Sequence, residues 1–227
     1  MPPNTEYKLP VVVLISGAGS NLQALIDAIA LEALPVEIRA VISNRANAEG
    51  LARAQQAGIA THILEHRSYP DRDSFDAALM NIIDSHQPEL VLLAGFMRIL
   101  TRDFVAHYSG RLINIHPSLL PEFPGLDTHR RAIETGKTEH GASVHFVTPE
   151  VDGGPVILQA RVPVAPGDTP ERLAARVLTQ EHIIYPLVLR WFAERRLRLL
   201  GNQVILDGAA LPQPLLLESL HEVHATS

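Results

Sequence analysis

Over the first half of the chain, short apolar runs rich in β-branched residues alternate with segments whose apolar residues recur at helical spacing. Five such runs predict buried parallel strands, at residues 11–15, 36–42, 59–64, 90–94 and 112–115. Helices are predicted between the first four strands, at residues 22–29, 48–57 and 74–86. The third helix is expected to turn an apolar stripe inward, formed by Phe75, Leu79, Ile82 and Ile83.

The second half of the chain follows a different pattern. Apolar and polar residues alternate at 142–147 and again at 156–164, which predicts an antiparallel strand pair joined by a loop of several residues. A long helix is predicted to follow. Thr169 is its candidate N-cap, Pro170 suits its first position, and it is expected to run to about Arg196.

Two proline-containing segments interrupt this pattern. Pro186 is expected to kink or break the long helix, because proline removes a backbone hydrogen bond. Residues 211–227 begin with a proline-rich stretch and are expected to form a C-terminal tail, which leaves a single domain over residues 1–210. Strands that alternate with helices predict the α/β class. We therefore expect a Rossmann-like, mostly parallel twisted sheet with helices on both faces and an antiparallel strand pair at the C-terminal end.

Three polar segments lie at the carboxyl ends of the predicted strands. They are the turn at residues 17–21, the segment 95–100, and the pair Asn114 and His116. In open α/β sheets, ligands bind beyond this edge of the sheet. We therefore expect the functional site to form there.

The composition narrows the possible functions. The chain has 227 residues, of which 46% are hydrophobic, which is enough for a substantial core. A net charge of -6 without any Lys/Arg-rich run argues against nucleic-acid binding as the main activity. The absence of cysteine excludes disulfides, thiolate metal sites and cysteine nucleophiles, and it is consistent with a cytoplasmic location. No signal sequence and no apolar run of about 18 residues occurs, so no membrane span is expected.

Asn114, His116 and the downstream Asp152 are the strongest candidates for chemistry. Asn114 and His116 stand two residues apart at the end of a strand, so their side chains point to the same face. An amide donor beside an imidazole can stabilise an oxyanion while protons move, and Asp152 can hold the imidazole in its charged form. The alternative is that Asn114 and His116 only satisfy backbone groups where the strand ends.

The glycine-rich turn after the first strand is the candidate phosphate site. Gly17 and Gly19 allow a tight turn and the close approach of a ligand to backbone N–H groups, at a helix N-terminus that favours an anion. A dinucleotide fingerprint needs a third glycine at the position where this chain has Leu22. We interpret the turn as a cradle for one phosphate, to which Ser20 and Asn21 add donors. A plain turn with Ser20 as the helix cap is the alternative.

Taken together, these residues resemble the family of phosphoribosylglycinamide formyltransferases, within the folate-dependent formyltransferases. The resemblance covers about residues 10 to 208. The motifs that carry it are residues 15–21, 93–100, 114–121, 141–147, 152–155 and 180–182. Asn114, His116 and Asp152 alone would indicate only the wider group of enzymes that use formyltetrahydrofolate. The Gly-Ser-Asn turn narrows the group, because in this family it holds the ribonucleotide phosphate.

The resemblance implies transfer of a formyl group from 10-formyltetrahydrofolate to the amine of glycinamide ribonucleotide, a step of purine synthesis. By similarity, Asn114 and a protonated His116 stabilise the tetrahedral oxyanion, and Asp152 supports the charge on His116. The implied contacts of the ribonucleotide are Gly19, Ser20, Asn21 and Glu181. The implied contacts of the folate are Arg72, Met97, Arg98, Ile99, Leu100, Asn114, Thr148, Pro149, Glu150, Val151 and Asp152.

One residue departs from the family pattern, and the role of another has two interpretations. Leu178 stands one helical turn before Glu181, where the family is expected to have a polar residue, so one contact to the nucleotide would be lost. His145 either supports the site or is a hydrogen-bonded structural histidine. Although the chain has 11 histidines, no helical metal motif such as His-Glu-x-x-His occurs, and no metal is expected.

Several rival functions remain to be weighed. A formyltetrahydrofolate deformylase would use water as the acceptor, but such enzymes usually carry an extra N-terminal domain, for which the strand starting at Val11 leaves no room. A transfer-RNA formyltransferase would need a further C-terminal domain. An NADP-binding reductase, with Asn44 and Arg45 near a 2′-phosphate, conflicts with Leu22, and a nucleotide sensor would not need the Asn-His-Asp set. We expect a monomer or homodimer without nucleic-acid or membrane partners.

Overall fold

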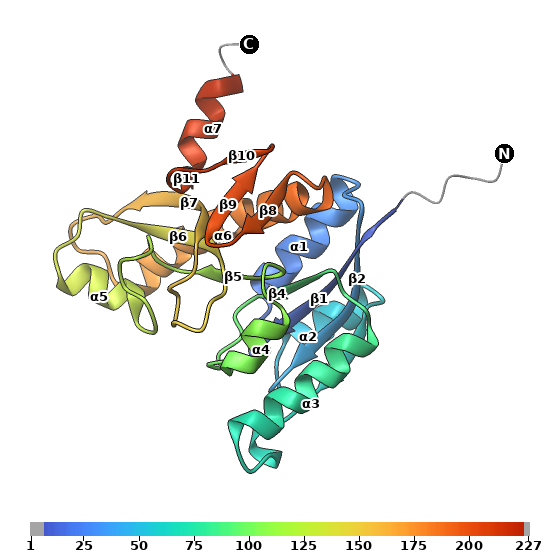
Figure 1. Cartoon of the computed structure of the whole chain (residues 1–227). Coiled ribbons are helices and arrows are strands. Elements are labelled where there is room, and N and C mark those ends of the chain that lie inside the picture. The colour runs from blue at the N-terminus through green and yellow to red at the C-terminus, as the bar shows by residue number, and fades with distance from the viewer. Residues whose placement is uncertain (1–6, 225–227) are drawn as a thin grey trace.

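The computed structural model describes residues 7–224, and its centre is an eight-stranded sheet (Figure 1). The strands follow the order β11-β7-β6-β5-β4-β1-β2-β3. Strands β1 to β5 are parallel and span Leu9–Ile15, Val36–Ser43, Ala60–Ile63, Leu90–Leu93 and Leu112–His116. Strand β6 (Glu139–Phe146) runs antiparallel to β5, and β7 (Val156–Pro163) runs antiparallel to β6. The predicted fold class, including the antiparallel pair, is confirmed.

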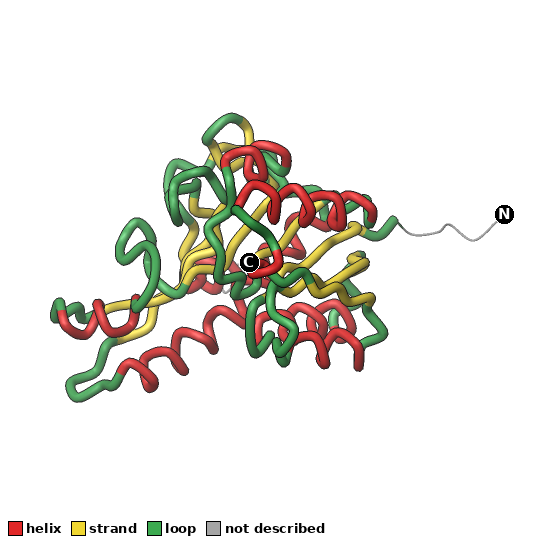
Figure 2. Tube along the Cα trace, turned by 90° about the horizontal axis from the view of Figure 1, so that it is seen from below, coloured by secondary structure: helices red, strands yellow, loops and turns green. Residues whose placement is uncertain are grey.

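Helices cover both faces of this sheet (Figure 2). Along β1, Val11, Val13 and Ile15 join one buried cluster while Val12 and Leu14 join the other, as strand alternation requires. The first cluster contains residues from α1 (Ser20–Leu31), α2 (Gly50–Gln56) and α6 (Pro170–Ala193). The second contains residues from α3 (Arg72–Ser85) and α4 (Arg102–His107). Burial on both faces explains why the parallel strands are apolar without interruption.

The strand order places a topological switch point between β1 and β4. The chain adds β2 and β3 on one side of β1 and then returns to add β4 and β5 on the other. Ligands of open α/β sheets bind in the crevice at such a point, beyond the carboxyl ends of the strands. The two segments that leave these strand ends, residues 16–21 and 95–101, are therefore well placed to line a site.

Helix α6 continues through Pro186, so of the kink or break expected there the break does not occur. The proline removes one backbone hydrogen bond, but tertiary packing holds the helix on either side of it. Ile184, Tyr185 and Val188 are fully buried in the core. In addition, the hydroxyl of Tyr185 donates to the carbonyl oxygen of Leu93 at 3.0 Å, which ties the helix to the sheet.

Between about Leu211 and His224 the chain forms regular structure where the sequence predicted a tail, and the last three residues of the predicted tail lie outside the described residues. Leu215–Leu216 form β11, which pairs in parallel with β7, and Leu217–His224 form α7 (Figure 1). The cause is apolar burial, because Leu217 is buried and Leu220 packs against the first core cluster. Before this segment, β8 (Leu197–Leu200), β9 (Gln203–Leu206) and β10 (Ala209–Ala210) form a small antiparallel sheet that the sequence pattern did not reveal.

Two short elements were also not predicted. They are α5 (Thr128–Glu134), which packs against α6, and a 3-10 turn at His66–Ser68. Neither segment has apolar residues that recur at helical spacing. Within residues 7–224, no helix combines the length and the apolar character needed to cross a membrane.

Candidate active site

Strand β5 presents Asn114 and His116 at the carboxyl edge of the sheet. Its neighbour β6 places His145 directly opposite Asn114 in the antiparallel register. Opposed residues on one face of an antiparallel pair are close enough for their side chains to interact. The side-chain amide of Asn114 lies 3.1 Å from Nε2 of His145.

The hydrogen bonds of His145 determine how the Asn114 amide is oriented. Nδ1 of His145 lies 2.9 Å from the carbonyl oxygen of Phe146, so this nitrogen carries the proton and donates it. Burial lowers the pKa of His145 to about 4, so the ring is neutral at pH 7 and Nε2 is an acceptor. Asn114 therefore donates one amide hydrogen to His145 and keeps the second for a ligand. The supporting role considered for His145 fits this geometry.

Asp152 lies in the turn between β6 and β7 and faces both histidines. Its backbone is left-handed, with φ of +51°, a conformation that aspartate tolerates better than most residues. Its Oδ2 lies 3.4 Å from Nδ1 of His116, and its Oδ1 lies 3.7 Å from Nε2 of His145. Oδ2 also accepts a hydrogen bond from the backbone N–H of Gly125 at 2.8 Å. The structure thus brings together Asn114, His116 and Asp152.

The second nitrogen of His116 is also engaged. Nε2 lies 3.0 Å from the carbonyl oxygen of Phe123 and donates to it. His116 therefore does satisfy one backbone group, as the alternative interpretation expected, in addition to facing Asp152. The Phe123 contact and the Asp152 contact to Gly125 dock the loop after β5 against the site. His116 would have to exchange one of these partners to reach a substrate.

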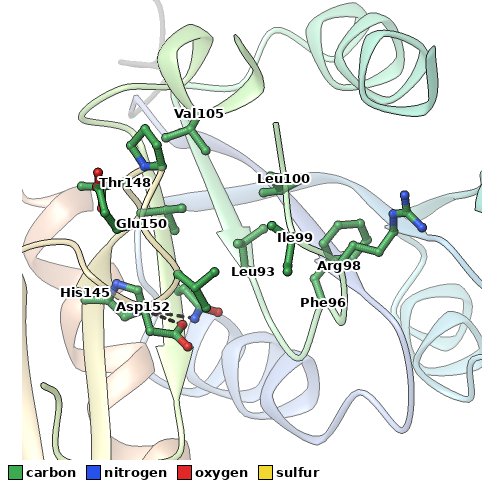
Figure 3. A pocket seen from close by; sticks show the side chains of 14 residues that line it. Leu93, Phe96, Arg98, Ile99, Leu100, Val105, His145, Thr148, Glu150 and Asp152 are labelled. Atoms are coloured by element: carbon green, nitrogen blue, oxygen red, sulfur yellow. Dashed lines mark hydrogen bonds and ion pairs between the residues drawn. The ribbon is translucent and has the colours of Figure 1, made fainter. Parts of the chain in front are cut away.

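A cavity of about 110 Å³ opens beside Asn114 and Asp152 (Figure 3). The segment that carries Phe96, Arg98, Ile99 and Leu100 lies across it from His145 and Asp152. The residues that line it are Leu93, Phe96, Arg98, Ile99, Leu100, Val105, Asn114, His145, Val147, Thr148, Pro149, Glu150, Val151 and Asp152.

Two of the residues expected to contact folate are not in this lining. Arg72 begins α3 on an exposed surface, and Met97 is exposed in the segment between β4 and α4. Conversely, Leu93, Phe96 and Val147 belong to the cavity wall, although sequence reasoning did not single them out for a role of their own. They resemble ordinary core residues in the sequence, and only the cavity distinguishes them.

The turn after β1 has the close packing that its glycines suggested. Gly19 has a φ of +72°, and a Cβ atom there would lie 2.5 Å from Cα of Gly50, so no side chain fits. Helix α1 begins at Ser20 without acidic residues in its first turn. The guanidinium of Arg53 is held next to the turn by its hydrogen bond to the carbonyl of Ala18, at 2.9 Å. Leu22 is fully buried in the core.

Asn21 and Glu181 meet beside this turn, although they are 160 residues apart in the chain. The amide of Asn21 donates to Oε2 of Glu181 at 2.6 Å, and both residues are buried. Burial raises the pKa of Glu181, and the hydrogen bond from Asn21 opposes that rise. Leu178 lies on the same helix, partly exposed.

Sequence comparison connects this geometry with known proteins. The model of the formyl transferase family matches residues 9–189. The chain belongs to the formyl transferase family. It is 59% identical to the phosphoribosylglycinamide formyltransferase of Escherichia coli, over 89% of this chain and 95% of that protein.

Solved structures of the family have the same fold. The phosphoribosylglycinamide formyltransferase from Coxiella burnetii is 58% identical, with a TM-score of 0.88 over 92% of this chain and 99% of that chain. A formyltetrahydrofolate deformylase from Pseudomonas syringae has a TM-score of 0.81 at 28% identity, over 88% of this chain and 66% of that chain. The fold is therefore shared by a phosphoribosylglycinamide formyltransferase and a formyltetrahydrofolate deformylase.

Several histidines near the site have lowered pKa values. Burial lowers the pKa of His140 to about 4, and nearby His129 and His116 contribute in the same direction. Burial also lowers the pKa of His129, whose ring packs edge-on against His140 at 5.2 Å. Among the described side chains, those of residues 7–220, histidines and carboxylates form no group of three or more that could hold a metal ion.

Because the pKa values of these histidines are lowered, we expect the free energy of unfolding to fall in acid. An unfolded histidine binds a proton near pH 6.5, whereas folded His140 and His145 bind one only near pH 4. Their contribution is therefore fully present above pH 6.5 and is lost as pH falls toward 4. In His140→Gln, the fall in unfolding free energy between pH 7 and pH 4.5 is expected to be smaller by about 2–3 kcal/mol. Urea unfolding at each pH measures it, and an unchanged pH dependence would contradict the assignment.

Proposed function

We propose that the protein transfers the formyl group of 10-formyltetrahydrofolate to the amine of glycinamide ribonucleotide, a step of de novo purine synthesis. The observation that carries the proposal is that Asn114 and Asp152 line one cavity, while Nδ1 of His116 lies 3.4 Å from Oδ2 of Asp152. Family membership, and the high identity to a phosphoribosylglycinamide formyltransferase over nearly its whole length, support the same reaction.

The chemistry follows from the donors at the cavity. The amine nitrogen of the ribonucleotide attacks the formyl carbon, and the formyl oxygen becomes an oxyanion. The free amide hydrogen of Asn114 and the imidazole of His116 beside Asp152 stabilise that oxyanion. Collapse of the intermediate breaks the bond from the formyl carbon to N10 of the folate. The amine loses a proton and N10 gains one, by way of His116 or a bound water.

The ribonucleotide is proposed to bind at the turn after β1. The free backbone N–H groups at the start of α1 suit a phosphate, and the guanidinium of Arg53 adds positive charge beside the turn. Gly19, Ser20 and Asn21 would then contact the phosphate. Glu181, which Asn21 holds in place, would accept hydrogen bonds from the ribose hydroxyls.

The folate is proposed to bind in the cavity. Its pterin ring would lie between the 98–100 segment and the 148–152 loop, whose residues form opposite walls (Figure 3). Apolar walls with a few polar groups are typical of sites that hold a flat heterocycle. Met97 and Arg72, which do not line the cavity, would contact only the part of the folate that extends beyond it.

Formyl release from 10-formyltetrahydrofolate by the purified protein, followed by absorbance, tests the function. Release that requires glycinamide ribonucleotide is the expected result. Release without the ribonucleotide would make the protein a deformylase with water as acceptor. Absence of release under both conditions, with folate still bound, would point to another amine and to Leu178 as the first residue to examine.

Replacement of Glu181 tests the nucleotide end of the site. Glu181→Ala is expected to raise KM for glycinamide ribonucleotide by about 10- to 100-fold, because the proposed acceptor for the ribose hydroxyls is lost. kcat and the affinity for tetrahydrofolate should change little. Glu171→Ala, at an exposed position in the first turn of the same helix, is the matched control. An unchanged KM in Glu181→Ala would exclude the ribose contact.

The proposal extends to the location and the oligomeric state of the protein. We propose that the protein acts in the cytoplasm, where its substrates would be made, as a monomer or homodimer with small-molecule substrates. Size-exclusion chromatography with light scattering distinguishes the two oligomeric states.

A further inference from the structure

The segment between β4 and α4, residues 95–101, forms one wall of the cavity without regular secondary structure; we call it the 95–101 loop. Its apolar side chains Met97 and Ile99 are 62% and 56% exposed. Exposed apolar groups on an irregular loop would tend to collapse onto the nearest apolar surface. The loop must therefore be held in shape by other parts of the molecule.

One anchor is Ser16, at the end of β1. Its hydroxyl accepts a hydrogen bond from the backbone N–H of Met97 at 2.8 Å and donates one to Oδ1 of Asn44 at 2.6 Å. Both roles of the hydroxyl are thus fixed, and Ser16 is only 2% exposed. The backbone N–H of Ser16 also donates to the carbonyl of Gly95 at 3.1 Å, so this residue holds the loop at two points.

The second anchor is Asp76 on α3. Its Oδ2 accepts a hydrogen bond from the backbone N–H of Thr101 at 2.7 Å, and the residue is only 1% exposed. Thr101 in turn caps α4 through Phe104, so Asp76 sets where the loop ends and the helix begins. The other oxygen, Oδ1, is buried without a protein hydrogen-bond partner. Burying a carboxylate with one oxygen unpartnered is unfavourable for stability, which suggests a role beyond packing.

We propose that Ser16 and Asp76 are positioning residues for the folate: they hold the 95–101 loop through the backbone of Met97 and Thr101. Ser16 and Asp76 hold the two ends of the wall that would contact the pterin, and neither of these two residues lines the cavity itself. This inference rests on the proposed function. Ser16 also immediately precedes the turn proposed to hold the phosphate, so the folate wall and the phosphate turn are attached to the same residue.

The test compares ligand affinities of Ser16→Ala and Asp76→Ala with those of matched controls. Ser43→Ala removes an equally buried hydroxyl at the end of the neighbouring strand, where it bonds only to the backbone of Arg45. Asp73→Asn changes an exposed carboxylate on the same helix as Asp76. Dissociation constants for tetrahydrofolate and for glycinamide ribonucleotide are measured separately by calorimetry, and thermal unfolding verifies the fold.

Both Ala variants are expected to bind tetrahydrofolate about 10-fold more weakly, because the loop samples other shapes. Asp76→Asn keeps an acceptor for Thr101 and should restore most of the affinity. Binding of the ribonucleotide should change little in Asp76→Ala, and the controls should behave as the wild type toward folate. If Asp76→Ala does not fold, Ser16→Ala against Ser43→Ala decides alone.

Unchanged folate affinity in a folded Ser16→Ala would overturn the positioning role. A loss of folate affinity in Ser43→Ala as large as that in Ser16→Ala would also overturn it, because the loss would then reflect general destabilisation. These outcomes differ from failure of the proposed function. A wild type that binds tetrahydrofolate but transfers no formyl group would contradict the function and leave the positioning test valid. A wild type that binds no folate would overturn both.

Discussion

Asn114→Ala is expected to lower kcat by about 100- to 1,000-fold while both substrates bind with nearly normal affinity. One well-aimed oxyanion donor typically contributes this much to a rate. The loss should fall on kcat because the oxyanion exists only in the transition state and intermediate. The orientation of Asn114 supports this role, since His145 takes one amide hydrogen and leaves the other for the substrate.

Steady-state kinetics and tetrahydrofolate binding by calorimetry separate the two effects. Asn114→Asp should lose at least as much activity, because a carboxylate offers no hydrogen to the oxyanion and repels it. Asn81→Ala, at an exposed position on α3, is the matched control and should keep full activity. A large loss of affinity at unchanged kcat would contradict the assignment of Asn114 as an oxyanion donor.

His116→Ala is expected to lower kcat at least as much as Asn114→Ala. The variant loses the imidazole that would stabilise the oxyanion together with the group that would move the proton. His116 is buried 3.4 Å from Asp152, in a setting where charge interacts more strongly than at the surface. Single-turnover measurements at saturating substrates report this step directly.

The surface pair His107 and Asp84 provides the control for His116. Nε2 of His107 lies 2.8 Å from Oδ2 of Asp84, but both side chains are exposed and away from the cavity. His107→Ala removes the same kind of pair and should leave kcat unchanged, because exposed ion pairs contribute little. If His116→Ala retained activity within about 10-fold of the wild type, proton transfer and oxyanion stabilisation would have to be assigned to other groups.

The approach of His145 to Asn114 illustrates what local pattern can and cannot predict. That Asn114 and His116 share one face follows from the two-residue period of a strand. That His145 faces Asn114 depends on the register of β5 against β6, and a shift by one residue would have turned it to the other face. Register is decided by packing across the whole sheet, which local sequence does not contain.

The same distinction applies to the parts of the fold that were predicted wrongly. Pro186 carries a strong local signal for a break, and the packing of Tyr185 against the sheet overrides it. The segment after Leu211 has the composition of a tail, yet β7 offers an open edge with which Leu215–Leu216 pair. In both places the deciding interactions come from residues far away in the chain.

The sequence by itself determined the α/β class, the carboxyl edge of the sheet as the place of the site, and the polar residues that could carry chemistry there. Periodicity and residue type are local properties, so they can be recognised in the sequence without a structure. Only the tertiary structure decided that His145 orients Asn114, that Glu181 meets Asn21, and that Ser16 and Asp76 hold the same loop. These contacts join segments distant in the chain, and only the packing of the whole core brings such segments together.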